Sequence, residues 1–235
     1  MVHCPASLLR AVYTPNIMAS GVELESVSKL YGTFVALRKV SLRIESGQCC
    51  VLLGENGAGK STLLRLIAGL IRPTHGSVRI FGEKPHDARE RIGYMSHAPM
   101  LYEEFSGAEN LRYFVALYRE RDCMIPEAAL AAVGLDASLK RPVGQYSQGM
   151  RQRASLARVL LAKPDLLLLD EPFSNMDAAS AKQMLDLLAG LRAQGKTIIL
   201  TTHQRELAEP LADLLLTLQA GSVASVVEAS GGVRR

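Results

Sequence analysis

The chain has 235 residues, of which 48% are hydrophobic, so it can bury the core of one or two compact domains. Its formal net charge of +4 is small and dispersed, which argues against nucleic acid as a partner. No apolar run approaches the ~20 residues needed to cross a bilayer. The four cysteines (Cys4, Cys49, Cys50 and Cys123) lack the spacing of metal ligands, so we expect reduced thiols.

Residues 1–21 are predicted to be a disordered or over-extended N-terminal segment. The first 20 residues contain one arginine, two prolines and no acidic residue, and Met18 is a plausible true start. No continuous apolar stretch precedes a cleavage site, which argues against a secretory signal. A single domain is expected over residues 22–220, followed by a C-terminal tail over 221–235.

The first half of this domain is predicted to be rich in strands. Short alternating runs of apolar and polar residues over 22–44 predict a small antiparallel β layer. Cys49–Leu53 is an apolar strand, and the helix that follows its loop is expected to end at Gly69. Two more short strands are predicted at 77–81 and 92–95.

The second half alternates helices and strands. From a capping box at Ser106 the pattern becomes helical. A helical insertion is expected over about residues 98–160. An apolar strand at 166–169, a helix at 178–193 and a β-branched strand at 197–201 follow. Strands and helices that alternate in this way predict an α/β fold, with a parallel sheet covered by helices on both faces.

Residues 54–62 read G-E-N-G-A-G-K-S-T, which contains a complete phosphate-loop motif, G-x-x-x-x-G-K-S. Its glycines let backbone N–H groups turn toward an anion, and the following helix points its positive end at the same place. Lys60 can reach the β- and γ-phosphates of a nucleotide, and the Ser61 hydroxyl can ligate Mg²⁺. The predicted nucleotide contacts are Gly54, Glu55, Asn56, Gly57, Ala58, Gly59, Lys60, Ser61 and Thr62.

Two carboxylates, Asp170 and Glu171, directly follow the buried strand at 166–169. A parallel strand delivers them to the carboxyl edge of the sheet, beside the phosphate loop. We expect Asp170 to hold Mg²⁺, directly or through water, and Glu171 to polarise a water molecule aimed at the γ-phosphate.

The stretch from Ser147 to Arg153, S-Q-G-M-R-Q-R, makes the pattern specific. A phosphate loop, this helix-opening motif, an apolar strand with Asp-Glu, and a strand ending in Thr-Thr-His together resemble the ABC ATPase family over residues 22–220. The resemblance implies an ABC-type nucleotide-binding domain, in which a RecA-like parallel core carries the antiparallel layer and the α-helical subdomain. It also implies that Ser147, Gln148 and Gly149 face the ATP held by a second subunit. Gln148 stands where the family usually has glycine.

The resemblance also gives roles to four further residues. Tyr31 occupies the position that stacks on adenine, Asp177 lies in the loop that links the two sites of a dimer, and His203 matches the switch histidine near the γ-phosphate. His97 stands where the family usually has a glutamine that reaches Mg²⁺ and the attacking water. His97 either contacts them through water or touches neither, and both alternatives stay open.

Within the family, the motifs look most like the ATP-binding subunit of haem exporters in cytochrome c maturation. Drug- or polysaccharide-type export ATPases are the alternative, and a soluble non-transport ABC ATPase is an alternative of another class. A phosphate-loop kinase or GTPase is disfavoured, because no base-reading Asn-Lys-x-Asp stretch occurs. The resemblance implies integral membrane permease subunits as partners and a peripheral place on the cytoplasmic face of the inner membrane. The apolar side chains of Met100, Leu101, Tyr102 and Phe105 are a candidate partner site.

Overall fold

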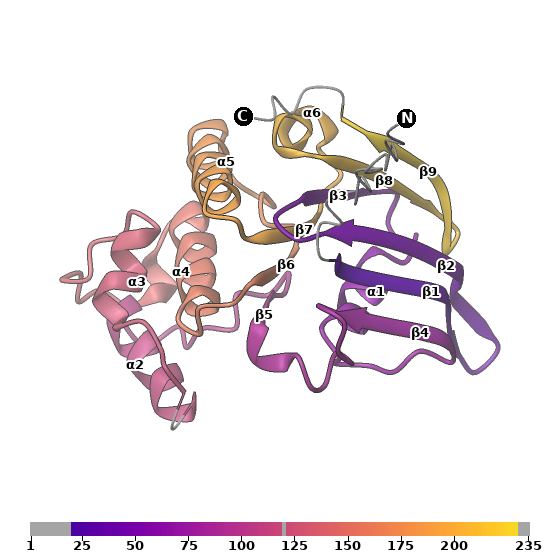
Figure 1. The fold of residues 1–235 in the computed structure, drawn as a ribbon. Helices are drawn as coiled ribbons and strands as arrows, with labels where there is room; N and C mark the ends of the chain where they lie inside the picture. Colours follow the sequence, from indigo (N-terminus) through magenta and orange to yellow (C-terminus); the bar gives the residue numbers. More distant parts are fainter. Residues whose placement is uncertain (1–19, 119–120, 230–235) are drawn as a thin grey trace, which may run out of the picture.

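A computed structural model describes residues 20–118 and 121–229 (Figure 1). The predicted N-terminal segment, apart from its last two residues, and the last six residues of the predicted tail lie outside these ranges. The described chain forms a three-stranded and a six-stranded sheet with helices around them. Within these ranges, no helix combines the length and the apolar character needed to cross a membrane.

The smaller sheet is the predicted antiparallel layer. Its strands are β1 (Ser20–Tyr31), β2 (Phe34–Glu45) and β4 (His75–Ile80), in the order β2-β1-β4. Both pairings are antiparallel. One face of the sheet is apolar and buried, which matches the alternation seen in the sequence.

The larger sheet is mainly parallel, as predicted. Its strands pair in the order β5 (Ile92–Met95), β6 (Leu166–Asp170), β7 (Thr197–Thr201), β3 (Cys49–Leu53), β8 (Leu214–Gln219) and β9 (Ser222–Glu228). All neighbours are parallel except β8 and β9. Strands β3, β6 and β7 are buried along their whole length, because both faces of the sheet are covered.

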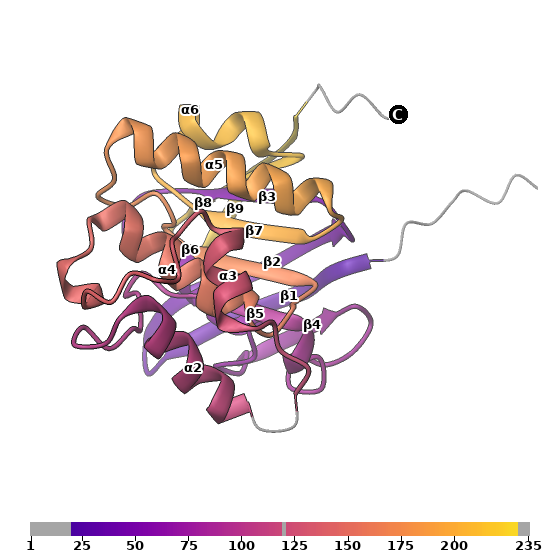
Figure 2. The ribbon, with the colours of Figure 1, turned by 90° about the vertical axis from the view of Figure 1, so that its left-hand side faces the viewer.

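Helix α1 (Lys60–Ile67) lies between the two sheets and packs its leucines against both. The other face of the large sheet is covered by α4 (Gln148–Leu160) and α5 (Ala178–Ala193), and α2 (Gly107–Tyr118) and α3 (Pro126–Ala132) pack beside α4 (Figure 2). This arrangement brings the carboxyl ends of β3, β6 and β7 to one edge of the sheet, next to the N-terminus of α1.

The region after residue 204 differs from the prediction. A short helix, α6 (Arg205–Ala208), follows β7, and the predicted tail begins with β9, which pairs antiparallel to β8. Ala220 and Gly221 form a two-residue turn in which both φ angles are positive, at 45° and 78°. Three short 3-10 helices at Arg89–Arg91, Val143–Gln145 and Glu209–Leu211 complete the described elements.

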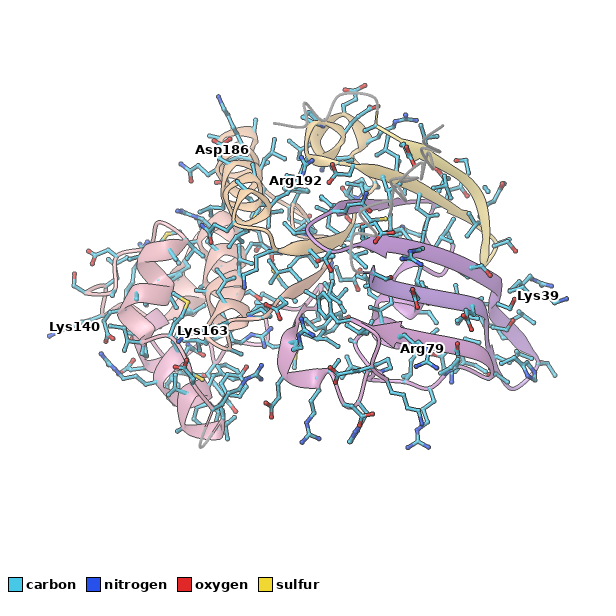
Figure 3. The ribbon with its side chains drawn as sticks, in the orientation of Figure 1. Lys39, Arg79, Lys140, Lys163, Asp186 and Arg192 are labelled. Atoms are coloured by element: carbon cyan, nitrogen blue, oxygen red, sulfur yellow. The ribbon has the colours of Figure 1, made fainter. Side chains whose placement is uncertain are left out.

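Basic side chains are spread over the surface. Lys39 lies on β2 at one end of the molecule and Lys140, after α3, lies at the other end (Figure 3). The expectation that nucleic acid is not a partner rests on the small, dispersed charge and stays a prediction.

Candidate nucleotide-binding site

The phosphate loop connects β3 to α1, and glycines let it approach neighbouring backbone closely. Gly54 and Gly59 have φ angles of 147° and 103°. A Cβ atom on Gly59 would lie 2.8 Å from the carbonyl oxygen of Ala36, and one on Gly54 would lie 2.4 Å from the carbonyl oxygen of Leu218. A Cβ atom on Gly221 would lie 2.7 Å from the same oxygen. Larger residues at these glycines would push the loop away from the sheets.

Lys60 supplies a positive charge inside this loop. Its side chain is buried, and Nζ donates to the carbonyl oxygens of Gly54 at 2.7 Å and Glu55 at 3.1 Å. The ammonium group is therefore held at the entrance of α1, where the positive end of the helix also favours an anion.

Ser61 and Asp170 bring two oxygen atoms together beside Lys60. Ser61 Oγ donates to Asp170 Oδ1 at 3.0 Å, and Asp170 is a buried residue at the end of β6. A hydroxyl and a carboxylate are ligands that Mg²⁺ prefers, and Mg²⁺ takes the rest of its shell from phosphate and water. No group of three or more His, Cys, Asp or Glu side chains suited to a metal occurs within residues 20–118 and 121–229. The Ser61 hydroxyl and the Asp170 carboxylate suit a Mg²⁺ ion that also binds a nucleotide and water.

Glu171 and His203 form a pair next to these oxygen atoms. Glu171 has a positive φ of 55°, and its Oε2 lies 3.2 Å from His203 Nδ1. The glutamate side chain is 17% exposed, whereas the histidine is 63% exposed. A carboxylate that is largely shielded but open on one side can orient a water molecule.

These groups line one cleft of about 800 Å³. The cleft brings together most of the predicted site, including His97 and His203, and adds Phe34 and Ala36, which sequence reasoning missed. It also includes Ser174, which opens the loop that the resemblance places between the two sites of a dimer. Its full lining is Phe34, Ala36, Gly54, Glu55, Asn56, Gly57, Gly59, Lys60, Ser61, Thr62, His97, Asp170, Glu171, Ser174 and His203. Ala58 is buried beneath the loop.

Tyr31 does not line the cleft. It pairs with Phe34 across the β1–β2 turn, and its ring centroid lies 5.1 Å from Lys29 Nζ. Phe34 is 64% exposed and lines the cleft, so it is an aromatic surface that can meet a base there. The role of Tyr31 in stacking on adenine stays a prediction.

Ser147, Gln148, Gly149 and Asp177 also lie outside the lining. Ser147 caps α4, and its Oγ accepts from the backbone N–H of Met150 at 3.3 Å. Asp177 caps α5 by accepting from the N–H of Ser180 at 2.9 Å, and hydrogen bonds from the backbone and side chain of Ser180 lower the pKa of Asp177. Ser147 and Asp177 are exposed, Gln148 is half-buried and Gly149 is buried. The roles of these four residues toward a second subunit stay predictions.

A phosphate loop at a strand–helix junction, a Ser–Asp oxygen pair and a Glu–His pair at one sheet edge define a nucleotide-binding protein of the phosphate-loop class. A family model described as ABC transporter matches residues 37–174. The chain therefore belongs to the ABC transporter family of ATP-binding proteins.

Two curated relatives show the same kinship. The Nod factor export ATP-binding protein I of Sinorhizobium fredii is 41% identical over 208 residues, which are 85% of this chain and 60% of the relative. A fluoroquinolones export ATP-binding protein of Mycobacterium tuberculosis is 38% identical over 226 residues, covering 94% of this chain and 75% of the relative. Neither name supports the haem-exporter group.

The fold matches that of a solved ATP-binding cassette, MJ0796, in a dimeric post-hydrolysis state bound to ADP and phosphate. The TM-score is 0.80 at 27% identity, and the match covers 89% of this chain and 99% of the other. The predicted α/β cassette fold is confirmed.

Proposed function

We propose that the chain is the ATP-hydrolysing subunit of a membrane exporter and binds ATP with Mg²⁺ in the 800 Å³ cleft. The observation that carries this proposal is the position of Glu171. Its carboxylate lies within 3.2 Å of His203, in the same cleft as Lys60 and the Ser61–Asp170 pair.

Each group then has a chemical task. Lys60 and the loop amides hold the β- and γ-phosphates, while Ser61 and Asp170 are the residues that would hold Mg²⁺. When bound, the metal ion neutralises charge that develops on the phosphates. Glu171 accepts a proton from the attacking water, and His203 orients the glutamate and contacts the γ-phosphate.

A second copy of the chain completes the site in this proposal. Ser147, Gln148 and Gly149 open α4 but do not line their own cleft. The positive end of α4 suits the open side of an ATP bound to another copy, in an ATP-sandwich dimer. The dimeric state named for the MJ0796 cassette supports this arrangement.

The proposed permease partner binds an aromatic patch made of Tyr102, Phe105, Tyr113 and Leu117. All four side chains are at least 40% exposed, and the rings of Tyr102 and Tyr113 are 4.9 Å apart. Exposed apolar groups that gather in this way favour a protein partner. Of the predicted contact residues, Leu101 packs against the core instead.

In this proposal, His97 connects the nucleotide-binding cleft to the aromatic patch. It lines the cleft, and the chain continues from it toward the aromatic patch. We expect its contact with Mg²⁺ or the attacking water to be bridged by water, because an imidazole has a shorter reach than the side chain of glutamine. We propose that permease subunits hold the chain as a peripheral subunit on the cytoplasmic face of the inner membrane.

For the transported substrate, we favour the drug- or polysaccharide-type alternative over haem export. The names of the relatives, Nod factor export and fluoroquinolones export, support this choice. A chain that does not co-purify with membranes of its source would instead favour the soluble ABC ATPase.

Substituting the proposed base tests the proposal directly. Glu171→Gln should lower the rate of ATP hydrolysis by about 10²-fold or more. It should still bind ATP and accumulate as a dimer, measured by gel filtration with and without ATP. Glu83→Gln, an exposed glutamate outside the cleft lining, is the matched control. Hydrolysis by Glu171→Gln at the wild-type rate would contradict the proposal.

A further inference from the structure

Thr201, the last residue of β7, is completely buried beside the site. It is the register partner of Asp170 on β6. Its hydroxyl group makes two hydrogen bonds: it donates to Asp170 Oδ1 at 2.8 Å and accepts from the backbone N–H of Glu171 at 2.9 Å.

The direction of both hydrogen bonds is fixed by chemistry. An ionised carboxylate can only accept, and a backbone amide can only donate. The single proton of the hydroxyl therefore points to Asp170, and its lone pair faces Glu171. A valine of the same shape can do neither.

Both neighbours need this support. Glu171 has a φ of 55°, a backbone conformation that residues other than glycine rarely adopt. Asp170 Oδ1 also accepts from Ser61 Oγ, and that hydroxyl is expected to turn toward Mg²⁺ when the ion binds. Thr201 then remains as the neighbouring side-chain donor that keeps the carboxylate in place.

We propose that Thr201 is a positioning residue that holds the metal-binding carboxylate of Asp170 and the backbone of Glu171 in one geometry. The inference rests on the proposed ATPase function. Thr201 is completely buried and does not line the cleft. It acts through Asp170 and Glu171, so its loss misaligns the base with the phosphate.

The same strand provides a matched control. Thr197, at the other end of β7, is also buried, and its Oγ1 accepts from the backbone N–H of Gly47 at 2.9 Å. It lies outside the cleft lining. Thr197→Val removes a similar hydroxyl from the same strand without touching Asp170 or Glu171.

In the purified chain, we expect Thr201→Val to lower kcat about 10- to 100-fold, because a small misplacement of reacting groups has effects of this size. The KM for ATP should stay within about threefold, because the phosphate loop is intact. The Mg²⁺ concentration for half-maximal rate should rise. Thr197→Val should keep the wild-type values of all three, and Thr201→Ser, which retains the hydroxyl, should restore kcat to within about threefold of wild type.

Because the valine variant can fail to fold, two variants with smaller side chains provide a second comparison. Thr201→Ser and Thr201→Ala differ only in the hydroxyl, and serine should be at least about tenfold faster. Equal rates for this pair, or a fully active Thr201→Val, would overturn the inference. If the wild-type chain does not hydrolyse ATP, both the proposed function and the inference are overturned. If the wild type and Thr201→Val are both fully active, only the inference is overturned.

Discussion

Phe34 and Tyr31 face each other across the turn between β1 and β2, and Phe34 lines the cleft. Base–aromatic stacking contributes about 1–3 kcal/mol per base. We therefore expect Phe34→Ala to weaken ATP binding by about tenfold or more, and Tyr31→Ala to have a smaller effect. Calorimetry in a Glu171→Gln background, where hydrolysis is blocked, measures both. A larger loss from Tyr31→Ala would restore the stacking role that the family resemblance implies.

At the scale of single residues, spacing predicted the groups that are local in the chain. The loop from Gly54 to Ser61 and the Asp170–Glu171 pair could be predicted because their chemistry depends on short-range sequence. The structure places both at the cleft. Phe34 and Thr201 escaped prediction for a different reason. Their roles depend on which residues face them across a strand pair, and a sequence does not fix that register.

At the scale of elements, strand β3 carries two adjacent thiols on opposite faces of the large sheet. Cys49 packs in the cluster under α4 and α5, and Cys50 packs in the cluster around α1. Burial raises the pKa of Cys49 to about 12 and raises that of Cys50 further. Both thiols therefore keep their protons in the folded protein well above pH 9.

This burial predicts a loss of stability at alkaline pH. In the unfolded chain the two thiols ionise near their ordinary pKa, so the unfolded state holds fewer protons between about pH 9 and pH 12. The free energy of unfolding should fall there by ~1.4 kcal/mol per pH unit for each thiol, and the contribution is fully present below that window. A Cys49→Ala, Cys50→Ala double variant should show a flatter decline in urea unfolding measured across this pH range.

Cys123→Ala provides the comparison, because that thiol is only partly buried. A double variant whose stability falls with pH as steeply as that of Cys123→Ala would contradict the prediction.

Elements with strong periodicity were predictable, and those set by tertiary pairing were not. The apolar runs of β3 and β6 and the β-branched run of β7 identified the buried strands. Strand β9 was missed because its turn uses Ala220 at a positive φ, where a turn of this type usually has Asn, Asp or Gly. Strand β9 is also mostly exposed, so it gave a weak apolar signal.

At the scale of the whole molecule, the aromatic patch is the surface on which we expect the proposed membrane partner to bind. Leu117 on α2 is 57% exposed within the patch, and Leu70 is 60% exposed outside it. Leu117→Glu should reduce the fraction of the chain recovered with salt-washed membranes of its source, because a buried, unpaired charge at an interface is costly. Leu70→Glu should be recovered like the wild type, and basal ATP hydrolysis should be unchanged in both. Equal membrane recovery of the two variants would exclude the patch as the contact.

Gly59 and Gly221 both lie close to Ala36, which brings backbone from three parts of the chain together. The N–H of Arg38 donates to the carbonyl oxygen of Gly221 at 2.8 Å, and the N–H of Gly221 donates to that of Ala58 at 3.1 Å. Strand β2, the phosphate loop and the β8–β9 turn are thus joined by consecutive backbone contacts. We therefore expect the two sheets to unfold together, and we expect a nucleotide that stabilises the loop to delay the melting of both.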